Sequence, residues 1–184
     1  MKYGMNLLLW SGEVTSEMLP TCEQLKTAGY DGVELPMFNL ELDYKSLGES
    51  LDSMGLARTA VTIRGEEDNP ISPDASVRAK GVELTKQTLD CCAAAGVETL
   101  VGPYHSALGY FSGAGPTDDE WKWGVDSMRQ VAEHAGQVGV KLGVEALNRF
   151  ECYFLNTHGD SLEGIIMSDK ECVGPGCRLC RKKR

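Results

Sequence analysis

The feature that most constrains the fold of this chain is a junction that occurs four times, where a helix-like segment ends at a glycine and a short apolar run follows. Glycine readily adopts the left-handed conformation that closes a helix, and a short apolar run is typical of a buried strand. The junctions contain Gly29, Gly55, Gly96 and Gly139. Strand and helix therefore alternate along the chain, which predicts a parallel sheet with right-handed crossovers.

The sequence predicts five strands and four helices in strict alternation. The strands are expected at residues 3–10, 32–36, 57–62, 98–102 and 141–146. The helices are expected at residues 17–28, 44–54, 75–95 and 118–138. The last helix begins with a capping box at residues 117–120 (Thr-Asp-Asp-Glu), and Ser72-Pro73-Asp74 is typical of a helix start.

This alternation is compatible with an open doubly wound sheet or with a (β/α)8 barrel. The first turn between strand and helix, residues 10–13 (Trp-Ser-Gly-Glu), lacks the Gly-x-Gly-x-x-Gly pattern, which argues against a dinucleotide-binding fold. Polar and aromatic segments follow the ends of the predicted strands, and in both architectures that side of the sheet binds ligands.

The charge balance excludes one class of partner. Lys and Arg number 18, Asp and Glu number 27, and the formal net charge is −9. Because nucleic-acid binding needs a basic face, we expect no nucleic-acid partner. The N-terminal apolar run is too short for a signal peptide, and no stretch reaches the length of a membrane span. The sequence therefore predicts a cytoplasmic protein without a membrane partner.

The chain contains seven cysteines, of which four are scattered and three cluster near the C-terminus. In an intracellular chain, scattered cysteines are expected to be reduced, buried thiols. This prediction applies to Cys22, Cys91, Cys92 and Cys152.

Several polar groups are collected where the apolar run at residues 140–144 ends. Glu145, Asn148, Arg149 and Glu151 follow that run closely. Charged groups at the end of a buried strand need a metal, a partner or a substrate to offset their loss of hydration. Residues 144–151 therefore predict a functional site on the ligand face of the sheet.

A long loop, residues 102–116, separates the fourth predicted strand from the last helix. Ordered loops of this length are usually functional. Its Ser-Gly-Ala-Gly stretch, residues 112–115, is compatible with a flexible active-site flap or with a backbone cradle for phosphate. His105 in the same loop is compatible with substrate contact or with a structural role.

Residues 144–151 (Val-Glu-Ala-Leu-Asn-Arg-Phe-Glu), followed by residues 153–157 (Tyr-Phe-Leu-Asn-Thr), resemble the sugar phosphate isomerase/epimerase family of xylose-isomerase-like TIM barrels. Within it they most resemble ketose 3-epimerases such as D-tagatose and D-psicose 3-epimerases. The resemblance extends from residue 1 to about residue 157, with support from segments 2–4, 69–74, 102–106 and 112–116, and from Trp121. It implies a TIM barrel and isomerase or epimerase activity in carbohydrate metabolism.

The resemblance implies roles for the carboxylates by their positions. Glu145 matches a glutamate that is both a metal ligand and a catalytic acid/base, and Glu151 matches one that contacts the substrate near O1. Glu34, near the end of the second predicted strand, matches a carboxylate that faces the pocket. Arg149 is expected to pair with a carboxylate in a structural role. Further substrate-binding positions match Trp10, His105, Tyr110 and Phe111.

The implied reaction is a metal-dependent proton transfer at C3 of a ketose or ketose phosphate, through an enediolate. A divalent cation such as Mn²⁺, Mg²⁺ or Co²⁺ suits a site of carboxylates and one His, and stabilises the enediolate. Inversion of the carbon requires an acid/base group on each face of the enediolate.

The family takes its other three metal ligands, an Asp in an Asp-Thr-x-His context, a His and a second Glu, from later strands. No such motif follows Thr157. A complete barrel needs roughly 250 residues, so we expect an α/β fold of about five βα units: a C-terminally truncated, partial (β/α)8 TIM barrel at residues 1–157. Residues 158–184 are expected to be an atypical Cys-rich basic tail.

Three interpretations of this tail remain open. They are a truncated or frame-shifted reading frame, a zinc-binding appendage built on Cys172, Cys177 and Cys180, and a genuine short form that completes its sheet by self-association. The open edges of a partial barrel predict a homo-oligomer or self-association.

Two functional hypotheses follow. The first is a metal-dependent ketose 3-epimerase. The second is a non-catalytic fragment with an incomplete metal site that binds a sugar or a partner, and here metal binding is expected to be weak or absent. The zinc-dependent abasic-site endonucleases, a related barrel family, are disfavoured by the net charge of −9.

Overall fold

The structure is a computed structural model, and it describes residues 1–157 and 159–160. The predicted tail at 158–184 therefore lies almost wholly outside the described residues, and so do its three cysteines. The described strands are β1 (Gly4–Asn6), β2 (Gly32–Pro36), β3 (Ala57–Val61), β4 (Thr99–Gly102) and β5 (Lys141–Val144). The described α-helices are α1 (Leu19–Thr27), α2 (Tyr44–Ser53), α3 (Ala75–Ala94) and α4 (Asp118–Val138).

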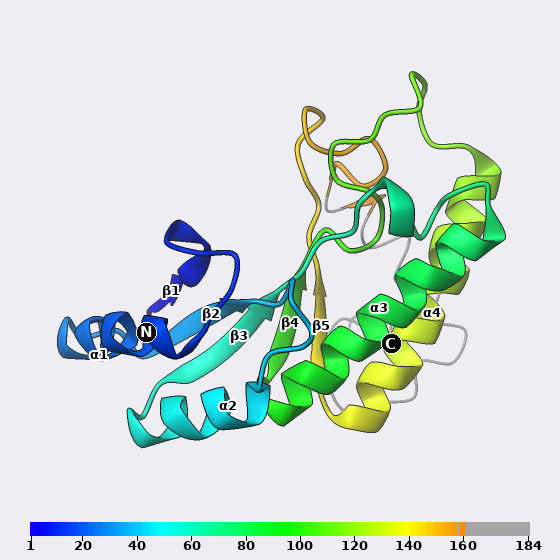
Figure 1. Cartoon of the computed structure of the whole chain (residues 1–184). Helices are drawn as coiled ribbons and strands as arrows, with labels where there is room; N and C mark the ends of the chain where they lie inside the picture. The colour runs from blue at the N-terminus through cyan, green and yellow to red at the C-terminus, as the bar shows by residue number, and fades with distance from the viewer. Residues whose placement is uncertain (158, 161–184) are drawn as a thin grey trace, which may run out of the picture.

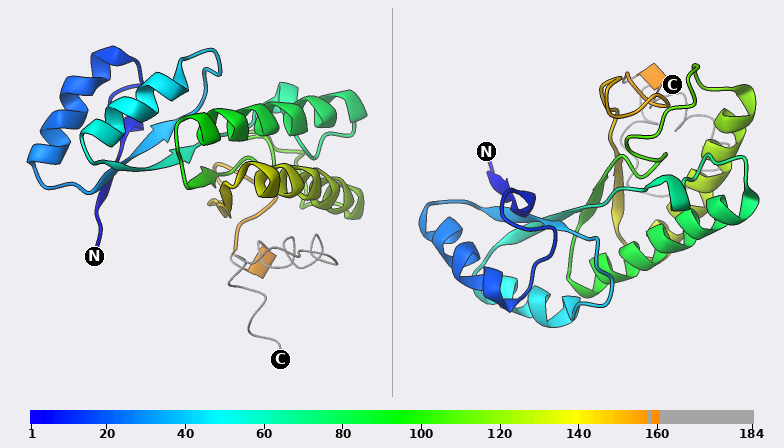
Figure 2. Two further views of the ribbon diagram at one scale, coloured as in Figure 1. Left: turned by 90° about the horizontal axis from the view of Figure 1, so that it is seen from below. Right: turned by 45° about the horizontal axis from the view of Figure 1, so that its top comes forward.

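The strands form one parallel sheet in the order β1-β2-β3-β4-β5, so each strand pairs with its neighbour in sequence. The helices follow one another along the outer face of this curved sheet (Figures 1 and 2). This is the arrangement of a partial (β/α)8 barrel, as predicted. Among the described strands, β1 and β5 are the two edges of the sheet.

The main core lies between the sheet and its helices. In β2, Val33 and Leu35 belong to this core and are almost fully buried. Because side chains of a strand alternate between its faces, Glu34 points to the opposite, inner face of the sheet. The alternation therefore separates the residues that hold the fold together from the residues that face a ligand.

The helix ends confirm the pattern on which the fold was predicted. The glycines at all four junctions, Gly29, Gly55, Gly96 and Gly139, have positive φ values between 64° and 97°. The start of α4 is the predicted capping box between Thr117 and Glu120. α2, α3 and α4 and strands β2 to β5 begin and end within two residues of the predicted bounds.

The predicted strand at residues 3–10 is wrong in its second half. β1 ends at Asn6, whose side-chain oxygen accepts a hydrogen bond from the Leu8 N–H at 2.8 Å and caps a 3-10 helix, η1 (Leu7–Leu9). An asparagine that bonds the backbone two residues later stabilises a turn in place of an extended strand. The apolar run is thus divided between strand and turn.

A smaller second core lies beneath residues 145–157. Phe154, Cys152, Leu155 and Ile71 are buried together, and Trp121 of α4 packs against Phe154 with 4.8 Å between the tilted rings' centroids. In Figure 1 this segment rises beside residues 103–117, above the ends of β4 and β5. The described part of the chain contains no helix long and apolar enough to cross a membrane.

Candidate functional site

A cleft of about 610 Å³ lies at the carboxyl ends of the strands, on the inner face of the sheet. Three carboxylates, Glu34, Glu145 and Glu151, are among its lining residues. The other lining residues are Asn6, Leu8, Val61, Ile63, Val101, Pro103, Leu108, Gly143, Val144 and Leu147. A lining of apolar side chains with a few polar groups is the usual character of a small-molecule site.

Glu34 is held by its neighbours in the sheet. Asn6 and Thr59 are its register partners on β1 and β3. The Asn6 amide donates a hydrogen bond to one Glu34 oxygen at 2.9 Å, and the Thr59 hydroxyl donates one to the other oxygen at 2.8 Å. These bonds fix the orientation of the carboxylate across three strands.

Glu145 directly follows β5, and its side chain is exposed at the cleft. Its backbone is fixed on both sides of the residue. The Glu145 N–H donates to the carbonyl of Gly102 at 3.2 Å, and its own carbonyl accepts a hydrogen bond from His105 Nε2 at 3.0 Å. A carboxylate that projects into solvent from a rigid backbone is available to bind a metal ion or a substrate.

His105 is only 1% exposed, and both of its ring nitrogens bond to protein atoms. Nε2 bonds the Glu145 carbonyl and Nδ1 bonds the Ser106 hydroxyl at 2.9 Å. Burial lowers the pKa of His105 to about 4, so the ring is neutral near pH 7. His105 thus lies behind the cleft wall, and its contact with a substrate stays a prediction.

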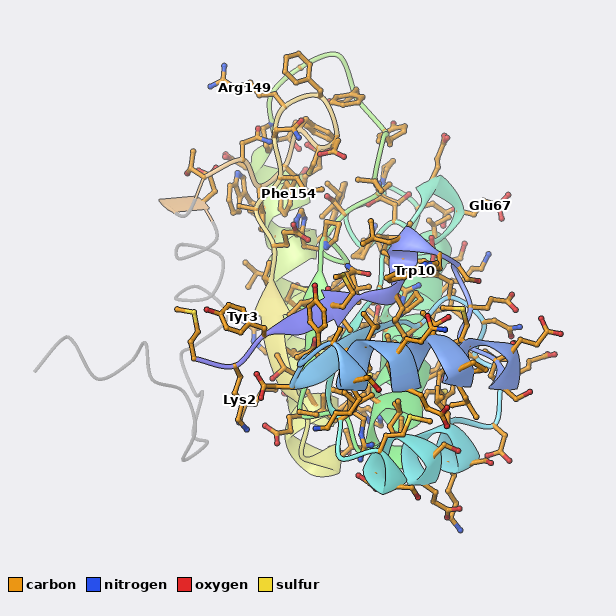
Figure 3. The ribbon with its side chains drawn as sticks, turned by 90° about the vertical axis from the view of Figure 1, so that its left-hand side faces the viewer. Lys2, Tyr3, Trp10, Glu67, Arg149 and Phe154 are labelled. Carbon is orange, nitrogen blue, oxygen red and sulfur yellow. The ribbon has the colours of Figure 1, made fainter. Side chains whose placement is uncertain are left out.

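Glu151 lies in the turn that closes the segment after β5. The amide of Asn148 donates a hydrogen bond to its carboxylate, and its backbone carbonyl accepts one from the Gly109 N–H at 2.8 Å. Arg149 is exposed, projects outward at the end of this turn (Figure 3), and forms no ion pair with any residue at 1–157 or 159–160. Its predicted pairing with a carboxylate is therefore not found in that part of the chain.

The predicted aromatic residues lie around the cleft and not on its lining. Trp10 is 50% exposed and follows η1, where Leu8 lines the cleft instead. Tyr110 and Phe111 each pack against Tyr153, with ring centroids 6.4 Å apart. The Tyr153 hydroxyl in turn donates a hydrogen bond to Glu120. These aromatic contacts join residues 110 and 111 to the segment after β5.

The glycine-rich stretch at residues 112–115 is exposed. Gly113 has a φ of +83°, and the Ser112 hydroxyl donates to the Ala114 carbonyl at 3.2 Å. The stretch turns back on itself in this way, and the flap and phosphate-cradle interpretations both remain predictions.

The donor set of the cleft does not complete a metal site. In the described part of the chain, no group of three or more His, Cys, Asp or Glu side chains is placed to hold a metal ion. Both oxygens of Glu34 already accept hydrogen bonds within the sheet. Glu145 is the one glutamate of the cleft lining whose carboxylate has no hydrogen-bond partner among the described residues. Cys22, Cys92 and Cys152 are free, buried thiols, as predicted, whereas Cys91 is free but only partly buried.

The two hydrogen-bond partners of Glu34 were missed because they carry no recognisable motif. Asn6 and Thr59 acquire their role only from the register that places them beside Glu34. The alternation of side chains along the strands would have placed Thr59 and Val61 on one face. No pattern in the sequence would have paired them with the residues of the neighbouring strands.

Comparisons with known proteins agree with this geometry. The family model described as "Xylose isomerase-like TIM barrel" matches residues 22–176. A D-psicose 3-epimerase of Agrobacterium fabrum is 28% identical over 171 residues, and an L-ribulose 3-epimerase of Mesorhizobium japonicum is 30% identical over 167 residues. These matches cover 90% and 89% of this chain but only 58% and 56% of the two enzymes.

Solved structures give the same result. A crystal structure of a D-allulose 3-epimerase from Methylomonas sp. in complex with D-allulose superposes with a TM-score of 0.84 at 25% identity. A D-psicose 3-epimerase determined in the presence of D-fructose superposes with a TM-score of 0.81 at 28% identity. They cover 91% and 93% of this chain, and the chain covers 59% and 61% of theirs. The chain thus spans about three fifths of the length of the relatives that it matches.

Proposed function

The chain belongs to the xylose isomerase-like TIM barrel family, and we propose that it acts as a sugar isomerase/epimerase at C3 of a ketose. One observation carries the proposal: Glu34, Glu145 and Glu151 converge on one cleft at the carboxyl ends of the strands. In barrels of this type, that face holds the active site. Relatives named as 3-epimerases of D-psicose and L-ribulose support a ketose substrate.

In the proposed reaction, the Glu145 carboxylate removes the proton from C3 of the ketose. The C2 carbonyl makes this proton acidic, because the electron pair of the broken C–H bond moves into a C2–C3 double bond and the negative charge passes to O2. Return of a proton from water to the opposite face of C3 restores the carbonyl and inverts the carbon. Glu145 suits the first step because its carboxylate is exposed at the cleft while its backbone is fixed.

We propose that the other two carboxylates bind the substrate. Glu151 accepts a hydrogen bond from a hydroxyl near O1, and Glu34 accepts one from a hydroxyl deeper in the cleft. Their positions on the lining and the bonds that orient Glu34 support these roles. Trp10, Tyr110 and Phe111 are proposed to cover the substrate from the rim, since aromatic side chains at a rim exclude water from a sugar site.

The family resemblance implies a divalent cation, Mn²⁺, Mg²⁺ or Co²⁺, with Glu145 as one ligand. The residues at 1–157 and 159–160 supply no group of three such ligands. The described chain therefore does not fit a complete metal site, and the proposed step rests on its own carboxylates. We expect Mn²⁺ to bind weakly at most.

The proposal is tested by following exchange of the C3 hydrogen in D₂O. Exchange needs one base, whereas epimerisation needs an acid/base group on each face of the enediolate. Exchange therefore detects a site that has an acid/base group on one face only. We expect C3 exchange of D-psicose or L-ribulose, detected by NMR, and a loss of at least about 100-fold in Glu145→Gln. Glu133→Gln on the exposed side of α4 is the matched control and should exchange at the wild-type rate. Absence of exchange for both sugars and for a ketose phosphate would contradict the proposal.

The second candidate is a non-catalytic protein that binds a sugar or a partner. The observation that favours it is the incomplete donor set in the described part of the chain. Calorimetry with the same ketoses distinguishes the two. Binding without C3 exchange supports this candidate, while binding with exchange supports the enzyme.

We also propose that the chain self-associates through the edges of its sheet. β1 and β5 are each paired on one side only among the described strands. The carboxyl half of β5, which lines the cleft, is only partly buried. Unpaired edges of a parallel sheet present backbone donors and acceptors to another chain.

A further inference from the structure

The loop after β4 contacts the backbone of both glutamates that follow β5. His105 Nε2 bonds the carbonyl of Glu145 at 3.0 Å, and the N–H of Gly109 donates to the carbonyl of Glu151 at 2.8 Å. The two acceptors are the same two residues whose carboxylates line the cleft. Residues 105–109 therefore bridge the two ends of the segment that carries the proposed base and the proposed substrate-binding carboxylate.

The direction of the hydrogen bonds is fixed by their chemistry. A carbonyl only accepts, so Nε2 of His105 carries the ring proton and donates it to Glu145. The neutral ring then leaves Nδ1 as an acceptor, and the Ser106 hydroxyl donates to it. The Ser106 oxygen is then free to accept from the thiol of Cys152, 3.3 Å away. The N–H of Phe154 donates to the Cys152 sulfur at 3.3 Å and ends this chain of hydrogen bonds.

The loop that presents His105 is itself held in place. The Ala107 N–H donates to the side-chain oxygen of Asn69 at 3.1 Å, and the Leu108 N–H donates to the Arg64 carbonyl at 2.8 Å. His105, Ser106 and Ala107 are each at most 2% exposed. A buried donor on a fixed loop can impose its position on a neighbouring segment.

Glu145 depends on this backbone support. Among residues 1–157 and 159–160, its carboxylate has no hydrogen-bond or ion-pair partner, in contrast to the two bonds that orient Glu34. Its peptide groups are held by Gly102 on one side and by His105 on the other. Because β5 ends at Val144, the sheet no longer fixes the carbonyl of Glu145, and His105 supplies the missing restraint.

We propose that His105 is a positioning residue: its Nε2–H holds the Glu145 carbonyl so that the carboxylate is aimed at C3 of the substrate. The role rests on the proposed function of Glu145 as the base. Ser106 and Cys152 support it by keeping the proton on Nε2. His105 does not touch the substrate, so its loss lowers the rate of proton transfer and leaves substrate affinity unchanged.

The test compares two replacements of His105 in the full chain. Gln carries an amide N–H near the place of Nε2, whereas Leu fills similar space without a donor. We expect His105→Leu to lower the maximal C3-exchange rate by about 10- to 100-fold with KM within about twofold of wild type. His105→Gln should restore most of that rate, and Ser106→Ala should show a smaller loss. His134→Leu, which removes the His paired with Asp90 on the outer helices, is the matched control and should exchange normally.

A second readout does not depend on turnover. We expect the ¹⁵N spectrum of the His105 ring to show the neutral Nε2–H tautomer near pH 7. The Glu145 carbonyl ¹³C resonance should shift in His105→Leu, return toward wild type in His105→Gln and stay unchanged in His134→Leu. If the wild type exchanges no C3 hydrogen, the proposed function fails, and this spectrum still tests the bond.

Three results would overturn the inference. One is a rise in KM with the exchange rate preserved in His105→Leu, which would mean that His105 contacts the ketose. Another is equal loss in the Gln and Leu variants. The third is an Nδ1–H tautomer, or a Glu145 carbonyl resonance that does not respond to removal of the ring.

Discussion

His105 shows how one residue can be recognised in the sequence and its setting still be missed. A histidine in a long loop on the ligand face was compatible with substrate contact or with a structural role. The structure buries the ring against Phe154, with centroids 6.0 Å apart, and gives both nitrogens protein partners. A buried, neutral imidazole lowers the stability of the folded chain in acid, because the charged form cannot be hydrated there.

This effect predicts a pH dependence of stability. The pKa of His105 is lowered to about 4 in the folded chain from an ordinary value of 6.5. As the pH falls, His105 therefore binds a proton at a higher pH in the unfolded chain than in the folded chain. The free energy of unfolding should be fully retained above about pH 6.5 and fall toward pH 4, by up to ~3 kcal/mol from this residue.

Urea unfolding of wild type and His105→Gln between about pH 7 and pH 4.5 checks this expectation. Carboxylates contribute to acid sensitivity in both proteins, so the difference between the two curves isolates His105. The wild type should lose more stability than the variant over this range. Parallel curves would mean that the ring is hydrated or charged in the folded state.

At the scale of elements, β4 is the strand on which the arrangement of the site depends. Its last residue, Gly102, has a φ of +129°, and a Cβ added there would lie 2.2 Å from the carbonyl oxygen of Thr62. The Gly102 carbonyl also accepts the bond from the Glu145 N–H. Only glycine allows the chains after β3 and β5 to approach this strand end so closely.

Gly102→Ala should therefore destabilise the fold by about 3 kcal/mol, because it combines an unfavourable φ with a backbone clash. Gly136→Ala on the exposed side of α4 is the matched control, since its Cβ would meet nothing within 4 Å. That helix substitution should stabilise by about 0.5–1 kcal/mol. Thermal unfolding of both variants measures the contrast, and equal effects would refute the close approach at Gly102.

The elements differ in how far the sequence predicted them. α4 and β2 have the predicted bounds because their signals, a capping box and apolar residues at alternate positions before a proline, are local. β1 does not, because its apolar run continues past Asn6 into η1. There a side-chain bond from one residue decides between strand and turn, and hydrophobicity alone cannot distinguish the two.

At the scale of the whole molecule, the described sheet is an arc and not a closed barrel. The chain spans 58% of the D-psicose 3-epimerase that it matches. Its inner face therefore has carboxylates and apolar side chains along one wall, and β1 and β5 form its described edges.

Such an arc is expected to associate with further copies, since paired edges would satisfy backbone groups and cover apolar surface. Light scattering across a dilution series should give a mass above that of one chain, falling as the concentration falls. A monodisperse monomer that unfolds cooperatively at every concentration would contradict this prediction.

The sequence by itself determined the order of strands and helices, the parallel sheet and the identity of the acidic segment at residues 144–151. These features depend on local signals: glycine conformation, helix caps, apolar periodicity and a recognisable motif. Only the tertiary structure decided which groups meet. It placed Asn6 and Thr59 beside Glu34, and it placed the buried ring of His105 against the backbone carbonyl of Glu145. The physical reason is that such contacts depend on strand register and on the path of loops distant in sequence, which no local pattern encodes.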